Sequence, residues 1–218
     1  MSESNLNFIP AKESKWFTML FDWYVRLLFR RRFKHVLIDQ HYQPGNESKT
    51  IYYLNHTSWW DGLIPLLLNQ KYFHQNARAM MEDKQMREHP FFKKIGAFSV
   101  NPDDPRSSVR SLRYAVESIN RPNSSLFIYP EGKIVPFSSE KPQFRKGLGW
   151  ISNQCPGIDV VPIGIYIHTA RYDKPELFIR VGKAEPVDHS MDSSVLNEIF
   201  EEKMGKLLET LQKDAHDF

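Results

Sequence analysis

The chain passes from a strand-like run into a turn and a helix within Thr50-Ile51-Tyr52-Tyr53-Leu54-Asn55-His56-Thr57-Ser58-Trp59-Trp60-Asp61-Gly62. The β-branched and aromatic residues at 50–54 favour a strand, and residues 60–69 have a helical pattern. On one regular helix, a five-residue step would place His56 and Asp61 about 140° apart. The two side chains meet if His56 closes the strand and Asp61 lies in the first turn of the helix, where the helix dipole favours a carboxylate.

The same alternation continues along the chain. Further strand-like runs lie near residues 35–39, 77–81, 125–129, 158–167 and 176–182. Further helical patterns lie near residues 83–94, 106–120, 145–154 and 192–213. This order predicts an α/β fold, a single-domain sandwich with a largely parallel central sheet flanked by helices and preceded by an N-terminal amphipathic helix.

Length and composition narrow the range of partners. A chain of 218 residues with 41% hydrophobic residues is large enough for one well-buried core. The single cysteine, Cys155, excludes an intramolecular disulfide and fits a reducing compartment. The net charge of +3 is mild and no nucleic-acid motif occurs, so we expect no nucleic-acid partner. The histidines lack metal-ligand spacing and the glycines form no nucleotide fingerprint, so we expect no metal and no bound cofactor.

The N-terminal segment, residues 1–34, combines an apolar helical stripe with a basic end at residues 30–34. The stripe consists of Trp16, Leu20, Trp23 and Leu27. Asp22 and Arg26 interrupt the apolar run, which is shorter than the roughly 20 residues that a spanning helix needs, and no signal-peptide pattern is present. We therefore expect a helix that lies in the membrane interface and a cytoplasmic protein bound peripherally to the inner face of the membrane. The alternative is a helix packed on the domain, with a solvated basic end.

Two polar segments follow predicted strands. His56 can take a proton near neutral pH, and a carboxylate such as Asp61 can fix its tautomer and stabilise the imidazolium. Residues 124–129 read as a buried strand that runs into Pro130-Glu131-Gly132-Lys133, a turn suited to gripping a polar, phosphorylated head group. Because ligands bind beyond the carboxyl ends of parallel strands, both segments are expected to face one crevice. The alternatives are a surface histidine beside a helix-starting aspartate, and an ordinary turn.

Together the two segments resemble the glycerolipid acyltransferase family, the lysophosphatidate acyltransferase or PlsC-like proteins. That family pairs His-x-x-x-x-Asp with Phe-Pro-Glu-Gly-Thr-Arg, where this chain has Tyr129-Pro130-Glu131-Gly132-Lys133-Ile134. Three further blocks follow in the family's order and are similar to its motifs: residues 90–101, Phe144-Arg145-Lys146-Gly147, and residues 160–164, which carry Pro162. The resemblance covers about residues 50 to 167, and it implies an acyltransferase domain at residues 35–218.

The resemblance implies an O-acyltransferase that moves a fatty acyl group from acyl-carrier protein or acyl-CoA to a hydroxyl of a lysophospholipid-like acceptor of the 1-acyl-glycerol-3-phosphate type. In this reading His56 is the general base and Asp61 orients it. The substrate-binding candidates are Glu131, Gly132, Lys133, Arg145, Lys146, Arg106 and Pro162. The thioester is a co-substrate, and no cofactor is implied.

Two departures from the family bear on the acceptor. The family's Thr-Arg is replaced by Lys133-Ile134, and its Asp-Arg in the second block by Asn101-Pro102. The family assigns both arginines to the acceptor's glycerol phosphate. Lys133 can replace one of them only as a point charge without the bidentate fork, so we expect broad selectivity among anionic lysolipids.

Two other classes remain open. A thioester or lysolipid hydrolase would use the same dyad on water, although no Gly-x-Ser-x-Gly elbow occurs. A non-catalytic lipid-binding protein would keep the fold and the aromatic helix without the chemistry.

Overall fold

Seven strands form one sheet in the computed structural model, which describes residues 8–138 and 140–218. The strands are β1 (Val36–Gln40), β2 (Lys49–Leu54), β3 (Asn76–Glu82), β4 (Ala97–Val100), β5 (Ser124–Ile128), β6 (Asp159–His168) and β7 (Glu176–Val181). Their order in the sheet is β1-β7-β6-β2-β5-β3-β4. All neighbouring pairs are parallel except β6 and β7, so the expectation of a largely parallel sheet is confirmed.

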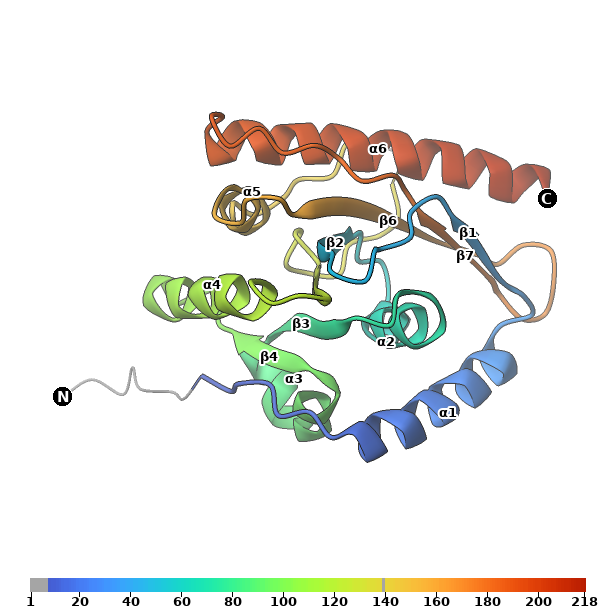
Figure 1. Ribbon diagram of the computed structural model, residues 1–218. Coiled ribbons are helices and arrows are strands. Elements are labelled where there is room, and N and C mark those ends of the chain that lie inside the picture. Colours follow the sequence, from blue (N-terminus) through green and yellow to red (C-terminus); the bar gives the residue numbers. More distant parts are fainter. Residues whose placement is uncertain (1–7, 139) are drawn as a thin grey trace.

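Helices cover both faces of the sheet (Figure 1). They are α1 (Lys15–Arg32), α2 (Ile64–Leu68), α3 (Asp83–Glu88), α4 (Pro105–Ile119), α5 (Gly147–Asn153) and α6 (Ser193–Asp217). Two short 3-10 helices, η1 (Trp59–Leu63) and η3 (Pro90–Ile95), and a short π-helix, η2 (Asn69–Phe73), are also present.

The central strand β2 shows why the sheet is covered on both faces. Tyr52 and Leu54 pack into the apolar cluster with α1 and α2, whereas Ile51 and Tyr53 pack into the cluster with α4, α5 and α6. All four side chains are fully buried. Successive side chains of a strand point to opposite faces, so a continuous apolar run is what a strand between two helical layers requires.

The structure corrects three element predictions. The strand pattern does not predict β4, which is only four residues long and follows Gly96. Gly96 has a φ of +99°, and a Cβ there would lie 2.4 Å from the carbonyl oxygen of Ala77. The single helix expected at 83–94 is wrong: α3 ends at Glu88 and η3 begins at Pro90, whose ring disfavours a helical conformation at the preceding residue. The helix expected at 60–69 is also divided, into η1, α2 and the start of η2.

Helix α1 lies along the edge of the molecule (Figure 1). It begins at the N-cap Ser14 and ends in Arg30, Arg31 and Arg32. Val25 and Phe29 are buried, whereas Trp16 and Trp23 are 67% and 66% exposed. Among the described residues, no helix has the length and apolar content needed to cross a membrane. The first seven residues of the predicted 1–34 segment lie outside the described residues.

Candidate active site

The end of β2 is anchored one residue before His56. Asn55 is buried, and its side-chain oxygen accepts the backbone N–H of Ile165 at 2.7 Å while its amide nitrogen donates to the carbonyl of the same residue at 2.9 Å. Ile165 belongs to β6, the neighbouring parallel strand. This pair of bonds continues the sheet contact past Leu54, so the backbone that carries His56 is held against the core.

Asp61 lies in η1, and its carboxylate is fully buried. Its Oδ2 accepts the backbone N–H groups of Thr57 at 2.6 Å and Ser58 at 2.8 Å, and its Oδ1 accepts the Ser58 hydroxyl at 2.7 Å. The same Oδ2 lies 3.2 Å from His56 Nδ1. An ionised carboxylate only accepts hydrogen bonds, so Nδ1 carries the proton and the lone pair is on Nε2. The side chains of His56 and Asp61 therefore meet in the geometry of a general base with its orienting carboxylate.

The end of β5 contacts the same histidine. The Tyr129 ring lies 4.5 Å from the His56 ring, and the Tyr129 hydroxyl donates to the backbone carbonyl of Asp61. Glu131 Oε2 accepts the backbone N–H of His56 at 3.0 Å. Burial raises the pKa of the Glu131 carboxyl above its ordinary value. β2 and β5 are parallel neighbours, so their carboxyl ends bring the two predicted segments together in one crevice.

His56 lines a cavity of about 810 Å³. Its walls are mainly apolar and include Leu63, Met80, Met81, Phe92, Leu112 and Leu148. A second hollow of about 530 Å³ shares lining residues with it, including Gly62, Pro65, Ala79 and Met81. This second hollow lies between α2 and β3, and its lining includes the polar side chains of Glu13, Lys15 and Arg78. A long apolar cavity with a base at one side suits a substrate that carries a hydrocarbon chain.

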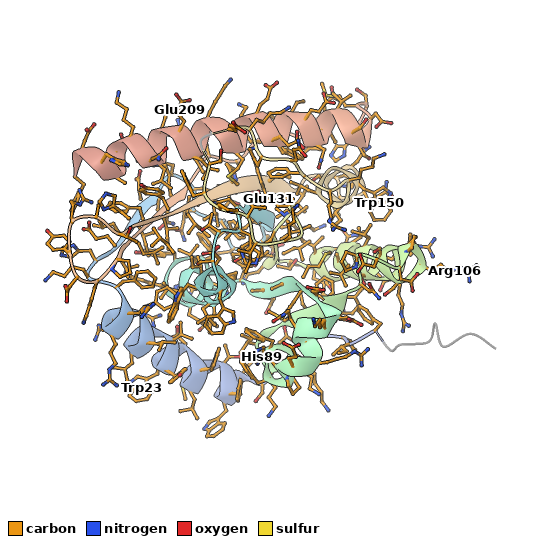
Figure 2. All side chains as sticks on the ribbon, turned by 180° about the vertical axis from the view of Figure 1, so that it is seen from behind. Trp23, His89, Arg106, Glu131, Trp150 and Glu209 are labelled. Atoms are coloured by element: carbon orange, nitrogen blue, oxygen red, sulfur yellow. The ribbon has the colours of Figure 1, made fainter. Side chains whose placement is uncertain are left out.

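The cationic candidates divide into two groups. Lys133, Arg145 and Lys146 line the cavity, and none of the three forms a salt bridge with another described residue. Arg106 is exposed in the first turn of α4 and lies away from Glu131 (Figure 2), while Ser108 and Leu112 of that helix line the cavity instead.

The remaining candidates are also placed by the structure. Gly132 lines the cavity, and Glu131 lies behind it against the backbone of His56. Pro162 lies within β6, where it pairs with Tyr53. It is not a lining residue of the cavity, so the structure does not bring Pro162 to the site.

Several residues that contact the dyad or line its cavity have no role predicted from the sequence. Ser58 and Asp61 form a capping box around η1, and the Ser-x-x-Asp spacing is a signal that could have identified Ser58. Tyr129 had no such signal, because its bond to Asp61 joins residues 68 positions apart. Met80 and Met81 in the cavity wall also had none, since a strand pattern does not show what a strand faces.

Two of three comparisons with known proteins find a match for this chain. The family model described as Acyltransferase matches residues 18–166. The fold is similar to the crystal structure of the 1-acyl-sn-glycerophosphate (LPA) acyltransferase PlsC from Thermotoga maritima, with a TM-score of 0.56 and 18% sequence identity. That match covers 88% of this chain and 77% of the other. A search of curated proteins finds no match.

Proposed function

Because this chain belongs to the acyltransferase family, we propose that it moves a fatty acyl group from acyl-CoA or acyl-carrier protein to a hydroxyl of a lysophospholipid-like acceptor. One observation carries the proposal: His56 is placed between the buried carboxylate of Asp61 and a mainly apolar cavity of about 810 Å³. The name of the similar PlsC structure, a 1-acyl-sn-glycerophosphate acyltransferase, supports the same class of acceptor.

The dyad carries out the transfer by general acid–base catalysis. Nε2 of His56 takes the proton of the acceptor hydroxyl while the oxygen attacks the thioester carbonyl carbon. The carbon–sulfur bond then breaks, and the imidazolium returns the proton to the leaving thiolate. Asp61 holds Nδ1–H and stabilises the transient positive charge. A thioester is already activated, so no covalent acyl-enzyme is needed.

The acyl chain of the donor occupies the apolar part of the cavity. Met80, Met81 and Leu63 provide apolar wall atoms there, and the methionine side chains are flexible enough to adapt to the chain. The acceptor head group lies on the opposite, polar side, near Gly132 and Lys133.

Turnover with a long-chain acyl thioester, with and without a lysophospholipid, tests the proposal. We expect transfer that depends on the acceptor, and a loss of about 10² to 10⁴ in rate for His56→Ala. Thioester hydrolysis without the acceptor would favour a hydrolase, and the absence of turnover would favour a lipid-binding protein. A folded His56→Ala variant with wild-type turnover would refute the mechanism.

We propose further that α1 binds the inner face of an anionic membrane and that the protein is peripheral there. Trp16 and Trp23 project from the outer side of the helix, as Figure 2 shows for Trp23. Arg30 and Arg31 follow in the last turn and are exposed. A helix with exposed tryptophans and a basic last turn suits the headgroup region of a bilayer. Aromatic rings insert into the interface there, and cations bind lipid phosphates.

Flotation with anionic liposomes tests this surface. Each cation near an anionic surface is worth about 1 kcal/mol, so the double variant Arg30→Ala/Arg31→Ala should bind about 30-fold more weakly at low salt. The matched control is Lys206→Ala/Lys213→Ala, which removes two exposed cations from α6 on the other side of the molecule (Figure 1). Equal flotation of both double variants would leave α1 as a helix that only packs on the domain.

A further inference from the structure

The two positions at which the resembled family has its arginines lie in the cavity wall. Ile134 and Pro102 are both lining residues, and Ile134 is 53% exposed. Neither side chain can donate a hydrogen bond, so these two positions offer an anion only an apolar surface. An anionic head group must therefore be bound by other residues of the cavity.

The turn that follows β5 holds Arg145 in the lining of the cavity that also contains His56. Its backbone N–H donates to the carbonyl of Pro130 at 2.8 Å. Its side chain packs directly on Gly132, where a Cβ would lie 2.5 Å from Nε of Arg145. Gly132 has a φ of +68°, which favours glycine on its own account. The next residue back, Glu131, accepts the backbone N–H of His56. The Glu131–Gly132 turn therefore contacts both residues: Gly132 packs against the Arg145 side chain, and Glu131 accepts the backbone N–H of His56.

The charges around the cavity favour an anion. Lys133, Arg145 and Lys146 line it, whereas Glu82 is the acidic member of its described lining residues. Arg145 has no salt-bridge partner among the described residues, so its donors are available to a ligand. A guanidinium offers two parallel N–H groups to a phosphate, which an ammonium does not.

Both substrates carry phosphate, and the geometry favours the acceptor. In a lysophospholipid only the glycerol separates the reacting hydroxyl from the phosphate, so the anion must lie close to the base. In an acyl thioester the long pantetheine arm separates the phosphates from the reacting carbonyl, so those phosphates lie far from His56. Arg145 packs on Gly132, the residue that follows Glu131, and it lines the same cavity as His56.

We infer that Arg145 is the specificity-determining residue for the acceptor, binding its phosphate over Gly132 while Ile134 and Pro102 form an apolar rim. The inference rests on the proposed acyl transfer and assigns to Arg145 the recognition of the lysophospholipid acceptor in that proposal. Lys133 and Lys146 assist as mobile point charges.

The test measures acceptor KM values in the Arg145→Gln variant at a saturating thioester concentration, and the thioester KM at a saturating acceptor concentration. The acceptors are lysophosphatidate and an uncharged monoacylglycerol with the same acyl chain. We expect the KM for lysophosphatidate to rise about 10-fold, with the KM for monoacylglycerol and for the thioester unchanged. This is the lower end of the range for a charge-assisted bond, because Arg145 is exposed to solvent. The control is Arg113→Gln, which removes an exposed arginine of α4 that does not line the cavity.

A second variant separates binding from folding. Ile134→Arg in the Arg145→Gln background supplies a new guanidinium to the same cavity and should lower the KM for lysophosphatidate again. A new arginine at this position would not repair a folding defect, so a restored KM would indicate that the guanidinium binds the acceptor. An unchanged ratio of the two acceptor KM values in Arg145→Gln would overturn the inference. A selective rise in the thioester KM would also overturn it, by assigning the guanidinium to the donor. If the wild-type protein transfers to neither acceptor, the proposed function itself fails.

Discussion

Replacing the buried carboxylate of the dyad in two different ways separates its chemistry from its structural role. Asp61→Asn keeps the shape of the side chain and an acceptor oxygen for the backbone N–H groups of Thr57 and Ser58. The Ser58 hydroxyl can turn to accept from the new amide, because its position allows either role. We therefore expect Asp61→Asn to fold with nearly wild-type stability.

The same variant should lose most of its activity. The amide carries no charge to stabilise the imidazolium of His56, and a charge-assisted hydrogen bond is worth about 1.5 to 3 kcal/mol, or roughly 10- to 150-fold in rate. The measurement is kcat for transfer from a labelled acyl thioester.

Asp61→Ala should lose both activity and stability. It leaves the N–H groups of Thr57 and Ser58 without their acceptor, at a cost of about 1 to 3 kcal/mol each. For a chain of this size, about 2 kcal/mol corresponds to a fall of at least roughly 4 °C in melting temperature. The reasoning is refuted if folded Asp61→Asn turns over like the wild type, or if Asp61→Asn and Asp61→Ala are equally destabilised.

Three further predictions concern the surroundings of the dyad. Tyr129→Phe removes the hydroxyl that donates to the Asp61 carbonyl, which keeps a backbone donor, so urea unfolding should show a loss of about 1 kcal/mol; no change would mean that this bond adds nothing to the turn. Burial raises the pKa of the Glu131 carboxyl in the folded state above its ordinary value of 4.5. The protonated carboxyl therefore stabilises the fold below pH 4.5, and this stabilisation is lost as the pH rises through the folded-state pKa. Glu131→Gln should therefore become more stable relative to the wild type across that window, and a constant difference in unfolding free energy between pH 4 and pH 7 would contradict this. Gly149→Ala places a Cβ 2.1 Å from a backbone oxygen in the first turn of α6, so it should lower the free energy of unfolding by about 1 to 3 kcal/mol. Gly62→Ala is the control, because a Cβ there has open space around it. Equal unfolding midpoints for the two variants would show that α5 and α6 can separate freely.

Local patterns predicted the framework of the site. The run at 50–54 indicated a strand, and a contact between His56 and Asp61 required a strand end followed by a helical turn. These features depend on chain geometry over a few residues, because side-chain direction alternates along a strand and backbone spacing sets what one turn can reach. The parallel arrangement followed from the alternation of strands and helices, which the order of elements alone reveals.

Other features of the site depend on contacts between distant segments. Tyr129 meets Asp61 only because β5 lies beside β2, and Arg145 reaches Gly132 only because the loop after β5 folds back on the end of that strand. Arg106 has the same side chain as Arg145, and nothing in the sequence excludes it from the site. In the structure, α4 directs Arg106 to solvent, away from Glu131. The sequence by itself determined which residues can act as base, carboxylate and cation, because that is set by side-chain chemistry. The tertiary structure decided which of the cations share the cavity with the base, because strand order and helix orientation are set by burial of the whole core.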